Sequence, residues 1–299
     1  MRREELPIAR YRRYMEKNRF DFTGRRVVVT GGNSGIGFAA ARLFLSAGAS
    51  VTIAYRSEKK GKAALSSLRA EFPAAECDAL PLDLSDAASI DAFSNALFER
   101  GKIDVFYHCA GVYYPAPPKT RAGLSATIAV NFCGTARLAK GVLPLLDEKG
   151  KMIFTTSLVD RFGKEKNTDP RTVKKEGYGA YSASKLLLSA YVLRKSREKK
   201  AGEPSFLAVH PGITATALLS PEKTSHKPLF SRLGHAFLFL FTHPKEKAAL
   251  TVLYAAQYGE NGECIAPRGI FGVSGYPHKT RFCRRARRFA DGQKDFPDM

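Results

Sequence analysis

The sequence lacks both a long apolar run and a closely spaced pair of cysteines. No stretch reaches the roughly 18 consecutive apolar residues that a membrane-spanning helix needs. The five cysteines stand apart with no C-x-x-C spacing, so neither a zinc site nor a redox pair is indicated, and we expect no metal. Isolated cysteines in a chain of 299 residues are typical of a reducing compartment, which predicts a cytoplasmic protein.

The first residues also lack the features of a targeting segment. There is no apolar stretch before Val27 and no serine before Ser34, whereas glutamates are present. We therefore expect neither a secretory signal nor a transit peptide. No Ser/Gly/Pro-rich linker or internal repeat divides the chain. A single domain is predicted over residues 22–275, between a basic N-terminal extension (1–21) and a basic C-terminal tail (276–299).

The chain carries a net charge of +20, and part of it is concentrated near the two ends. Residues 1–26 hold nine Lys/Arg and four Asp/Glu, and residues 276–299 hold seven and three. Solvated basic tails are the simplest interpretation. Peripheral contact with an anionic membrane is the alternative. Because no zinc finger or RNP motif is present, we expect no specific nucleic-acid partner.

Short β-branched or apolar runs alternate with helical patterns along most of the chain. This alternation predicts an α/β fold, a three-layer Rossmann-type doubly wound parallel sheet with helices on both faces. A ligand is expected beyond the carboxyl ends of the strands. The expected strands are 26–30, 50–55, 77–82, 103–107, 152–155 and 206–209, and the expected helices 8–19, 36–47, 59–71, 88–100, 126–146, 181–196 and 245–258.

A glycine-rich loop joins the first expected strand to the first helix of the alternation. It reads Thr30-Gly31-Gly32-Asn33-Ser34-Gly35-Ile36-Gly37, a T-G-x-x-x-G-x-G pattern. Gly31 allows a tight turn, Gly35 a close backbone approach to a pyrophosphate, and Gly37 close packing of helix on strand. The helix N-terminus would face the phosphate charge. The loop, including Asn33, Ser34 and Ile36, therefore predicts a dinucleotide site.

The end of the second strand indicates which dinucleotide binds. An NAD enzyme usually places an acidic residue there to hold the ribose 2′-hydroxyl, but residues 50–57 contain none. Arg56 stands there instead, and a guanidinium can pair with a 2′-phosphate. We therefore predict NADP(H) in preference to NAD(H). The alternative is that Arg56 is an ordinary exposed charge.

Candidate reacting groups lie in the second half of the chain. Tyr181 and Lys185 are four residues apart, on one face of an expected helix. A nearby ammonium can bring a phenol closer to a working pKa. Ser157 follows a strand, where its hydroxyl could donate to a carbonyl oxygen as charge develops. Asn131 interrupts a helical pattern, which suggests a specific hydrogen-bonding role for its amide.

With these motifs in this order, the chain resembles the short-chain dehydrogenase/reductase family over about residues 22–275. The resemblance implies that Tyr181 is the proton donor or acceptor and that Ser157 orients the substrate oxygen. Lys185 would bind the nicotinamide ribose and lower the pKa of Tyr181, and Asn131 would hold a relay water. The implied activity is hydride transfer between NADP(H) and the carbonyl or alcohol of a small molecule. Further implied cofactor contacts are Asp83, Leu84, Ala110, Gly111, Pro211, Gly212, Ile213 and Thr216.

The sequence departs from the family pattern at two places. His108-Cys109 stands where Asn-Asn usually precedes Ala110-Gly111, and we expect His108 to be structural rather than catalytic. Ser157 and Tyr181 are 24 positions apart, about twice the common spacing. The charged insert 161–177 is expected to be a surface loop or short helix. Long spacing resembles the retinol-dehydrogenase-like branch, which hints at a lipophilic substrate.

Several interpretations stay open at this point. The apolar segment 228–241, with four phenylalanines, either lines the substrate pocket or lies in a membrane interface. The resemblance also implies that the helices bearing Asn131 and Tyr181 form a homodimer, although a monomer is equally compatible with the sequence. The alternative to an enzyme is a catalytically inactive NADP(H)-binding regulator or scaffold.

Overall fold

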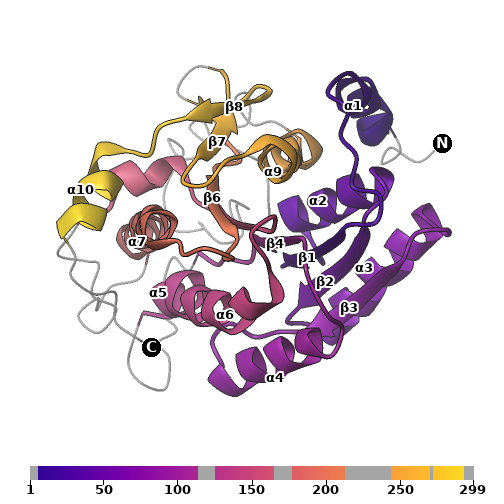
Figure 1. The fold of residues 1–299 in the computed structure, drawn as a ribbon, viewed down its shortest axis with the longest axis horizontal. Coiled ribbons are helices and arrows are strands. Elements are labelled where there is room, and N and C mark those ends of the chain that lie inside the picture. Colours follow the sequence, from indigo (N-terminus) through magenta and orange to yellow (C-terminus); the bar gives the residue numbers. More distant parts are fainter. Residues whose placement is uncertain (1–5, 114–124, 165–176, 213–243, 270–271, 293–299) are drawn as a thin grey trace, which may run out of the picture.

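Figure 1 shows the computed structural model, which describes residues 6–113, 125–164, 177–212, 244–269 and 272–292. Its strands form one sheet in the order β3-β2-β1-β4-β5-β6-β7-β8, and all neighbours pair in parallel except β7 and β8. The predicted doubly wound α/β fold is confirmed. The strands are β1 (Arg26–Thr30), β2 (Ser50–Tyr55), β3 (Cys77–Pro81), β4 (Val105–His108), β5 (Lys151–Thr155), β6 (Ser205–Val209), β7 (Cys264–Pro267) and β8 (Pro277–Thr280).

Helices cover both faces of this sheet (Figure 1). One face carries α1 (Leu6–Lys17), α2 (Gly35–Ser46), α3 (Glu58–Glu71) and α9 (Lys245–Tyr258). The other carries α4 (Ala87–Phe98), α5 (Ala126–Ile128), α6 (Thr135–Val142), α7 (Tyr178–Glu198) and α10 (Arg284–Gly292). Three short helices, η1 (Ala129–Gly134), η2 (Leu143–Leu145) and η3 (Leu158–Phe162), complete the described elements.

The central strands form because they can be buried on both faces. In β1, Val27, Val28 and Val29 are all fully buried. Successive side chains point to opposite faces, so Val28 belongs to the core under α7 while Val27 and Val29 belong to the core under α2 and α9. A continuous β-branched run with both faces covered is typical of a parallel strand. The sheet thus separates two hydrophobic cores.

Part of the predicted C-terminal tail is built into the domain. Residues 277–280 form β8, which pairs antiparallel with β7, and α10 packs on α7. Phe282 and Phe289 are buried in the core, whereas the arginines of α10 lie outside it. Charge dominates the composition of this segment and conceals the few apolar residues that anchor it. Four-residue strands such as β7 and β8 are also too short to show alternation in the sequence.

The N-terminal helix α1 likewise packs on the domain. Tyr11 and Met15 are buried, and the ring of Tyr14 stacks on Tyr276 with centroids 4.3 Å apart. Basic residues near both ends are therefore carried on elements that contact the core. Within the described residues, no helix combines the length and the apolar character that crossing a bilayer would need.

Candidate functional site

The glycine-rich loop after β1 adopts the tight geometry that its sequence predicts. Gly31 and Gly35 have φ of +65° and +57°, values that favour glycine. A Cβ at Gly37 would lie 2.5 Å from the Gly31 carbonyl oxygen, so a larger residue would push α2 off the loop. Ser34 precedes α2 without capping it through its side chain. The first amides of α2 are therefore left without that cap, and they lie at the positive end of the helix dipole.

The loops after β1 and β4 lie against each other at the point where strand order reverses. The Thr30 hydroxyl oxygen accepts hydrogen bonds from the Cys109 and Ala110 amides, at 2.9 and 3.0 Å. A Cβ at Gly31 would stand 3.1 Å from Ala110 Cα. The crevice beside such a switch point is where open α/β sheets bind ligands. The structure thus brings Ala110 next to the glycine-rich loop.

A hollow beside the glycine-rich loop contains two lysines that the sequence analysis did not identify. Asn33, Ser34 and Gly35 line it from the loop, Lys60 from α3 and Lys245 from α9. Arg56, just after β2, is exposed. Lys60 lies in the first turn of α3, soon after Arg56 in the sequence, and this nearness to Arg56 is the signal that could have pointed to it. Lys245 carries no such local signal, because α9 meets α2 only in the tertiary structure.

Asp83 and Leu84 follow β3 at the same carboxyl edge of the sheet. The Asp83 carboxylate accepts hydrogen bonds from the amide and the hydroxyl of Ser85, at 2.9 and 2.6 Å. Leu84 is buried, and its carbonyl oxygen lies where a Cβ on Gly134 would be. Only a glycine at position 134 therefore lets the helix bearing Asn131 approach Leu84 this closely.

Asn131 lies in a π-helical turn inside the helical stretch predicted over 126–146. The turn η1 separates α5 from α6, and π-bulges are frequent at functional sites. The Asn131 amide oxygen accepts from the Val112 amide at 2.7 Å, and its nitrogen donates to the Val112 carbonyl and the Ser184 hydroxyl. Asn131 thus ties the loop after β4 to α7.

Lys185 extends from α7 to the end of β5. It is 4% exposed, and its ammonium donates to the Thr155 carbonyl oxygen at 2.8 Å. A Cβ on Gly111 would lie 3.3 Å from the Asn131 amide oxygen and 3.8 Å from the ammonium, so Gly111 lies between these two groups. Asn131, Gly111 and Lys185 are therefore brought together.

Tyr181 meets Ser157 at the same place. The Ser157 hydroxyl lies close enough to the phenol to lower its pKa, and the Tyr181 ring packs edge-on against Tyr113 with centroids 5.6 Å apart. The Lys185 ammonium lies 5.8 Å from the centroid of the Tyr181 ring. Although 24 positions separate Ser157 from Tyr181 in the sequence, the fold brings their side chains together.

The pKa values of the two central groups are set mainly by burial. Loss of solvent raises the pKa of Tyr181 to about 12, although the hydrogen bond with Ser157 opposes the rise. Burial lowers the pKa of Lys185 to about 8. Desolvation is the largest influence on the pKa of Tyr181, and a lowering of that pKa by Lys185 stays a prediction from the resemblance. At neutral pH the phenol therefore keeps its proton and the amine stays largely charged.

Of the predicted nicotinamide-holding segment, Pro211 and Gly212 are described. Pro211 is buried, and the Gly212 amide donates to His210 Nδ1 at 3.0 Å. Gly212 has φ of +79°. Ile213, Thr216 and the apolar segment 228–241 lie outside the described residues, as does most of the insert 161–177. The first part of that insert forms the end of η3.

His108 is a core residue, as the sequence analysis expected. Its ring stacks on Phe154 with centroids 4.4 Å apart, and burial lowers its pKa to about 3. Among the described residues its Nε2 has no hydrogen-bond partner.

We expect His108 to make the protein sensitive to acid. The unfolded chain takes up the imidazole proton near pH 6.5 and the folded chain only near pH 3, so the free energy of unfolding falls as pH drops through this window. At pH 4.5 the loss relative to pH 7 is about 2–3 kcal/mol from this group. Urea unfolding of wild type and His108→Phe at both pH values measures it. An equal loss in both proteins would contradict the assignment.

The sequence of this chain is similar to a known family and to proteins within it. A family model described as short chain dehydrogenase matches residues 25–227. Retinol dehydrogenase 12 of Homo sapiens is 32% identical over 237 residues, which cover 78% of this chain and 73% of that protein. A short-chain dehydrogenase/reductase of Armillaria gallica is 31% identical over 264 residues, covering 83% and 82% of the two chains.

Two solved structures have folds similar to that of this chain. An uncharacterized protein from Mycobacterium paratuberculosis has a TM-score of 0.69 at 27% identity, covering 91% of each chain. A short chain dehydrogenase from Burkholderia cenocepacia, solved in complex with NADP, has a TM-score of 0.61 at 22% identity, covering 85% of this chain and 96% of that one. The second similarity concerns the fold alone.

Proposed function

Because the chain belongs to the short-chain dehydrogenase family, we propose that it is an NADP(H)-dependent oxidoreductase acting on a carbonyl or alcohol group. One observation carries the proposal. Ser157 and Tyr181 lie together at the carboxyl edge of the sheet, close enough for the Ser157 hydroxyl to lower the pKa of the phenol, with the Lys185 ammonium 5.8 Å from the Tyr181 ring centroid. Two hydroxyls and a cation at one point form a set that can hold and protonate a substrate oxygen.

The chemical roles follow from the electrostatics. Tyr181 donates the proton, because its raised pKa keeps the phenol neutral at working pH. Ser157 binds the same substrate oxygen and orients it toward the phenol. Lys185 stabilises the negative charge that develops on the phenol oxygen as the proton leaves. Asn131 positions α7 and the loop after β4. A bound NADPH would supply the hydride to the carbonyl carbon.

The glycine-rich loop fits the pyrophosphate of such a cofactor. Gly31, Gly35 and Gly37 give a loop that would admit no side chain, and the start of α2 offers backbone donors. Arg56 and Lys60 would bind the 2′-phosphate, with Lys245 adding positive charge to the same hollow. The further residues that would hold the cofactor are Asn33, Ser34, Ile36, Asp83, Leu84, Ala110, Gly111, Tyr181, Lys185, Pro211, Gly212, Ile213 and Thr216.

A lipophilic substrate is part of the proposal. Two relatives of this chain are named for alcohols of hydrocarbon character, Retinol dehydrogenase 12 and the Polyprenol dehydrogenase of Mus musculus, the latter 29% identical over 253 residues. The 24-position spacing from Ser157 to Tyr181, which resembles the retinol-dehydrogenase-like branch, supports the same class of substrate.

Cofactor preference gives a direct test. We expect NADPH to bind wild type at least about tenfold more tightly than NADH, a difference of about 1.4 kcal/mol. Arg56→Ala and Lys60→Ala should each remove much of that preference, because each deletes one cation facing the 2′-phosphate. The chain has no Trp, so the emission of the reduced nicotinamide itself is followed in the titration.

Lys62→Ala is the matched control. Lys62 is also on α3, and its side chain is 74% exposed, but it does not line the hollow beside the loop. Equal affinity for the two nucleotides in wild type would reject the NADP(H) assignment. Tight binding without turnover of any carbonyl compound would favour the regulatory or scaffold alternative.

Homodimer formation and peripheral membrane contact stay predictions from the sequence. Helix α7 is buried around most of its length within one chain, and α10 covers part of it. This arrangement leaves little of α7 for a second copy.

A further inference from the structure

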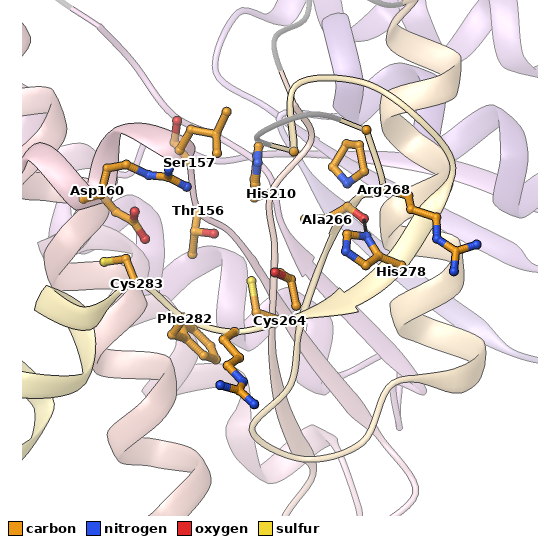
Figure 2. A pocket seen from close by; sticks show the side chains of 17 residues that line it. Thr156, Ser157, Asp160, His210, Cys264, Ala266, Arg268, His278, Phe282 and Cys283 are labelled. Carbon is orange, nitrogen blue, oxygen red and sulfur yellow. Dashed lines mark hydrogen bonds between the residues drawn. The ribbon is translucent and has the colours of Figure 1, made fainter.

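A cavity of about 310 Å³ begins at Ser157 and runs under η3 along β7 and β8. Figure 2 shows Thr156 and Ser157 from the end of β5 on one side of it and Ala266, Arg268 and His278 on the other. We call it the cationic cavity, defined by Ser157, Asp160, Arg161, Arg268, His278 and Arg281. Its volume is at the small end of ligand pockets, so it suits a compact group and not a long hydrocarbon.

Positive charge is in excess around this cavity. Arg161, Arg268 and Arg281 reach it from three different segments, and all three are exposed. In the part of the chain that the structure describes, none of the three forms an ion pair with a carboxylate. A guanidinium presents several donors in a planar fork that matches a carboxylate or a phosphate.

The one carboxylate in the lining, that of Asp160, does little to offset this charge. Asp160 is 8% exposed, and its Oδ2 accepts a hydrogen bond from the Ser189 hydroxyl at 2.8 Å. Burial raises the pKa of Asp160, so its charged form is disfavoured. Ser189 belongs to α7, which means that this carboxylate is directed at the helix below the cavity.

Two histidines add hydrogen-bonding groups to the lining. His210 Nδ1 accepts from the Gly212 amide, which places the ring proton of the neutral form on Nε2. His278 Nδ1 faces the Ala266 carbonyl oxygen at 2.9 Å and therefore donates to it. Polar groups thus predominate in the part of the cavity lining that lies between Ser157 and the three arginines.

We infer that the cationic cavity binds an anionic group of the substrate, a carboxylate or a phosphate, while Ser157 and Tyr181 hold the reacting oxygen. The inference rests on the proposed function and narrows it to carbonyl or alcohol compounds that carry an acidic group. It also divides the substrate into an acidic end near η3 and β8 and a reacting end at Ser157.

The test compares ω-oxo carboxylic acids of increasing length with unbranched aldehydes of the same length, as substrates with NADPH. We expect at least one oxo acid to exceed its matched aldehyde about tenfold in kcat/KM, mostly through KM. Arg268→Gln and Arg281→Gln should each reduce that preference several-fold. Arg288→Gln is the control, because Arg288 is an exposed arginine of α10 that does not line the cavity. Equal turnover of acids and aldehydes, or a preference unchanged in the cavity variants, would overturn the inference and leave the proposed function standing.

A binding measurement tests the anion site separately from the proposed catalytic function. Adipate should raise the Tm of wild type, and 1,6-hexanediol should not, because only the dicarboxylate offers anions to the arginines. The rise should be lost in Arg268→Gln and kept in Arg288→Gln. If it follows this pattern while no carbonyl compound is turned over, the anion site stands and the proposed catalysis fails. No rise in wild type would count against the anion site.

Discussion

Replacement of Tyr181 by phenylalanine is expected to lower kcat for carbonyl reduction by about 10²–10⁴-fold, the usual contribution of a positioned proton donor. The variant loses only the phenol oxygen, which lies near the Ser157 hydroxyl. Its ring can keep the edge-on contact with Tyr113. NADPH affinity should change little, because the cation at Lys185 and the glycine-rich loop are untouched. Stopped-flow measurement of NADPH oxidation gives kcat, and fluorescence titration gives the Kd.

Tyr178→Phe is the matched control for this experiment. Tyr178 begins the same helix, and its side chain is 53% exposed, so removing its hydroxyl should leave kcat near the wild-type value. If Tyr181→Phe kept more than about a tenth of the wild-type kcat, Tyr181 could not be the proton donor. Ser157→Ala would then become the next variant to examine, since Ser157 contacts the same oxygen.

Replacement of Arg42 by methionine is expected to lower the free energy of unfolding by about 3–5 kcal/mol. The Arg42 guanidinium forms two hydrogen bonds of 2.6 Å with Glu71 on α3 and lies 3.7 Å from Glu246 on α9. The side chains of Arg42 and Glu246 are only 7% and 6% exposed. Removing the cation leaves a buried carboxylate without its partner, which costs more than the pair itself contributes. Urea unfolding at pH 7 measures the change.

Two further variants show whether the buried charge is the cause. Arg137→Met breaks a bidentate pair with Asp91 in which the side chains are 38% and 56% exposed, and it should leave stability almost unchanged. The double variant Arg42→Met/Glu246→Leu removes the stranded carboxylate and should recover much of the loss. Failure of the double variant to recover stability would assign the effect to packing of the Arg42 side chain instead.

Local patterns in the sequence were sufficient for much of the cofactor region. The β-branched run of β1 and the glycines at 31, 35 and 37 encode a strand, a tight loop and a helix start within twelve residues. Arg56 marks the end of β2 in the same local way. The Tyr181–Lys185 spacing needs only a helix to place both side chains on one face. Each of these features depends on backbone conformation over a few residues.

Other parts of the site could not be predicted, because they depend on distant segments. The π-turn at Asn131 is set by Gly134 approaching the Leu84 carbonyl and by Val112 bonding the Asn131 amide. Lys245 reaches the hollow beside the loop only because α9 packs on α2. In the same way, the buried side chains of Phe282 and Phe289 anchor β8 and α10 to the domain. The basic residues around them made this segment look like a solvated tail in the sequence.

The sequence by itself determined the α/β class and indicated the candidate reacting groups, because periodicity, glycine geometry and helix spacing act locally. Only the tertiary structure decided the electrostatics. Burial raises the pKa of Tyr181 to about 12 and lowers the pKa of Lys185 to about 8. The meeting of Arg161, Arg268 and Arg281 around one cavity likewise required the fold, since desolvation and long-range proximity belong to the folded chain and to no short stretch of it.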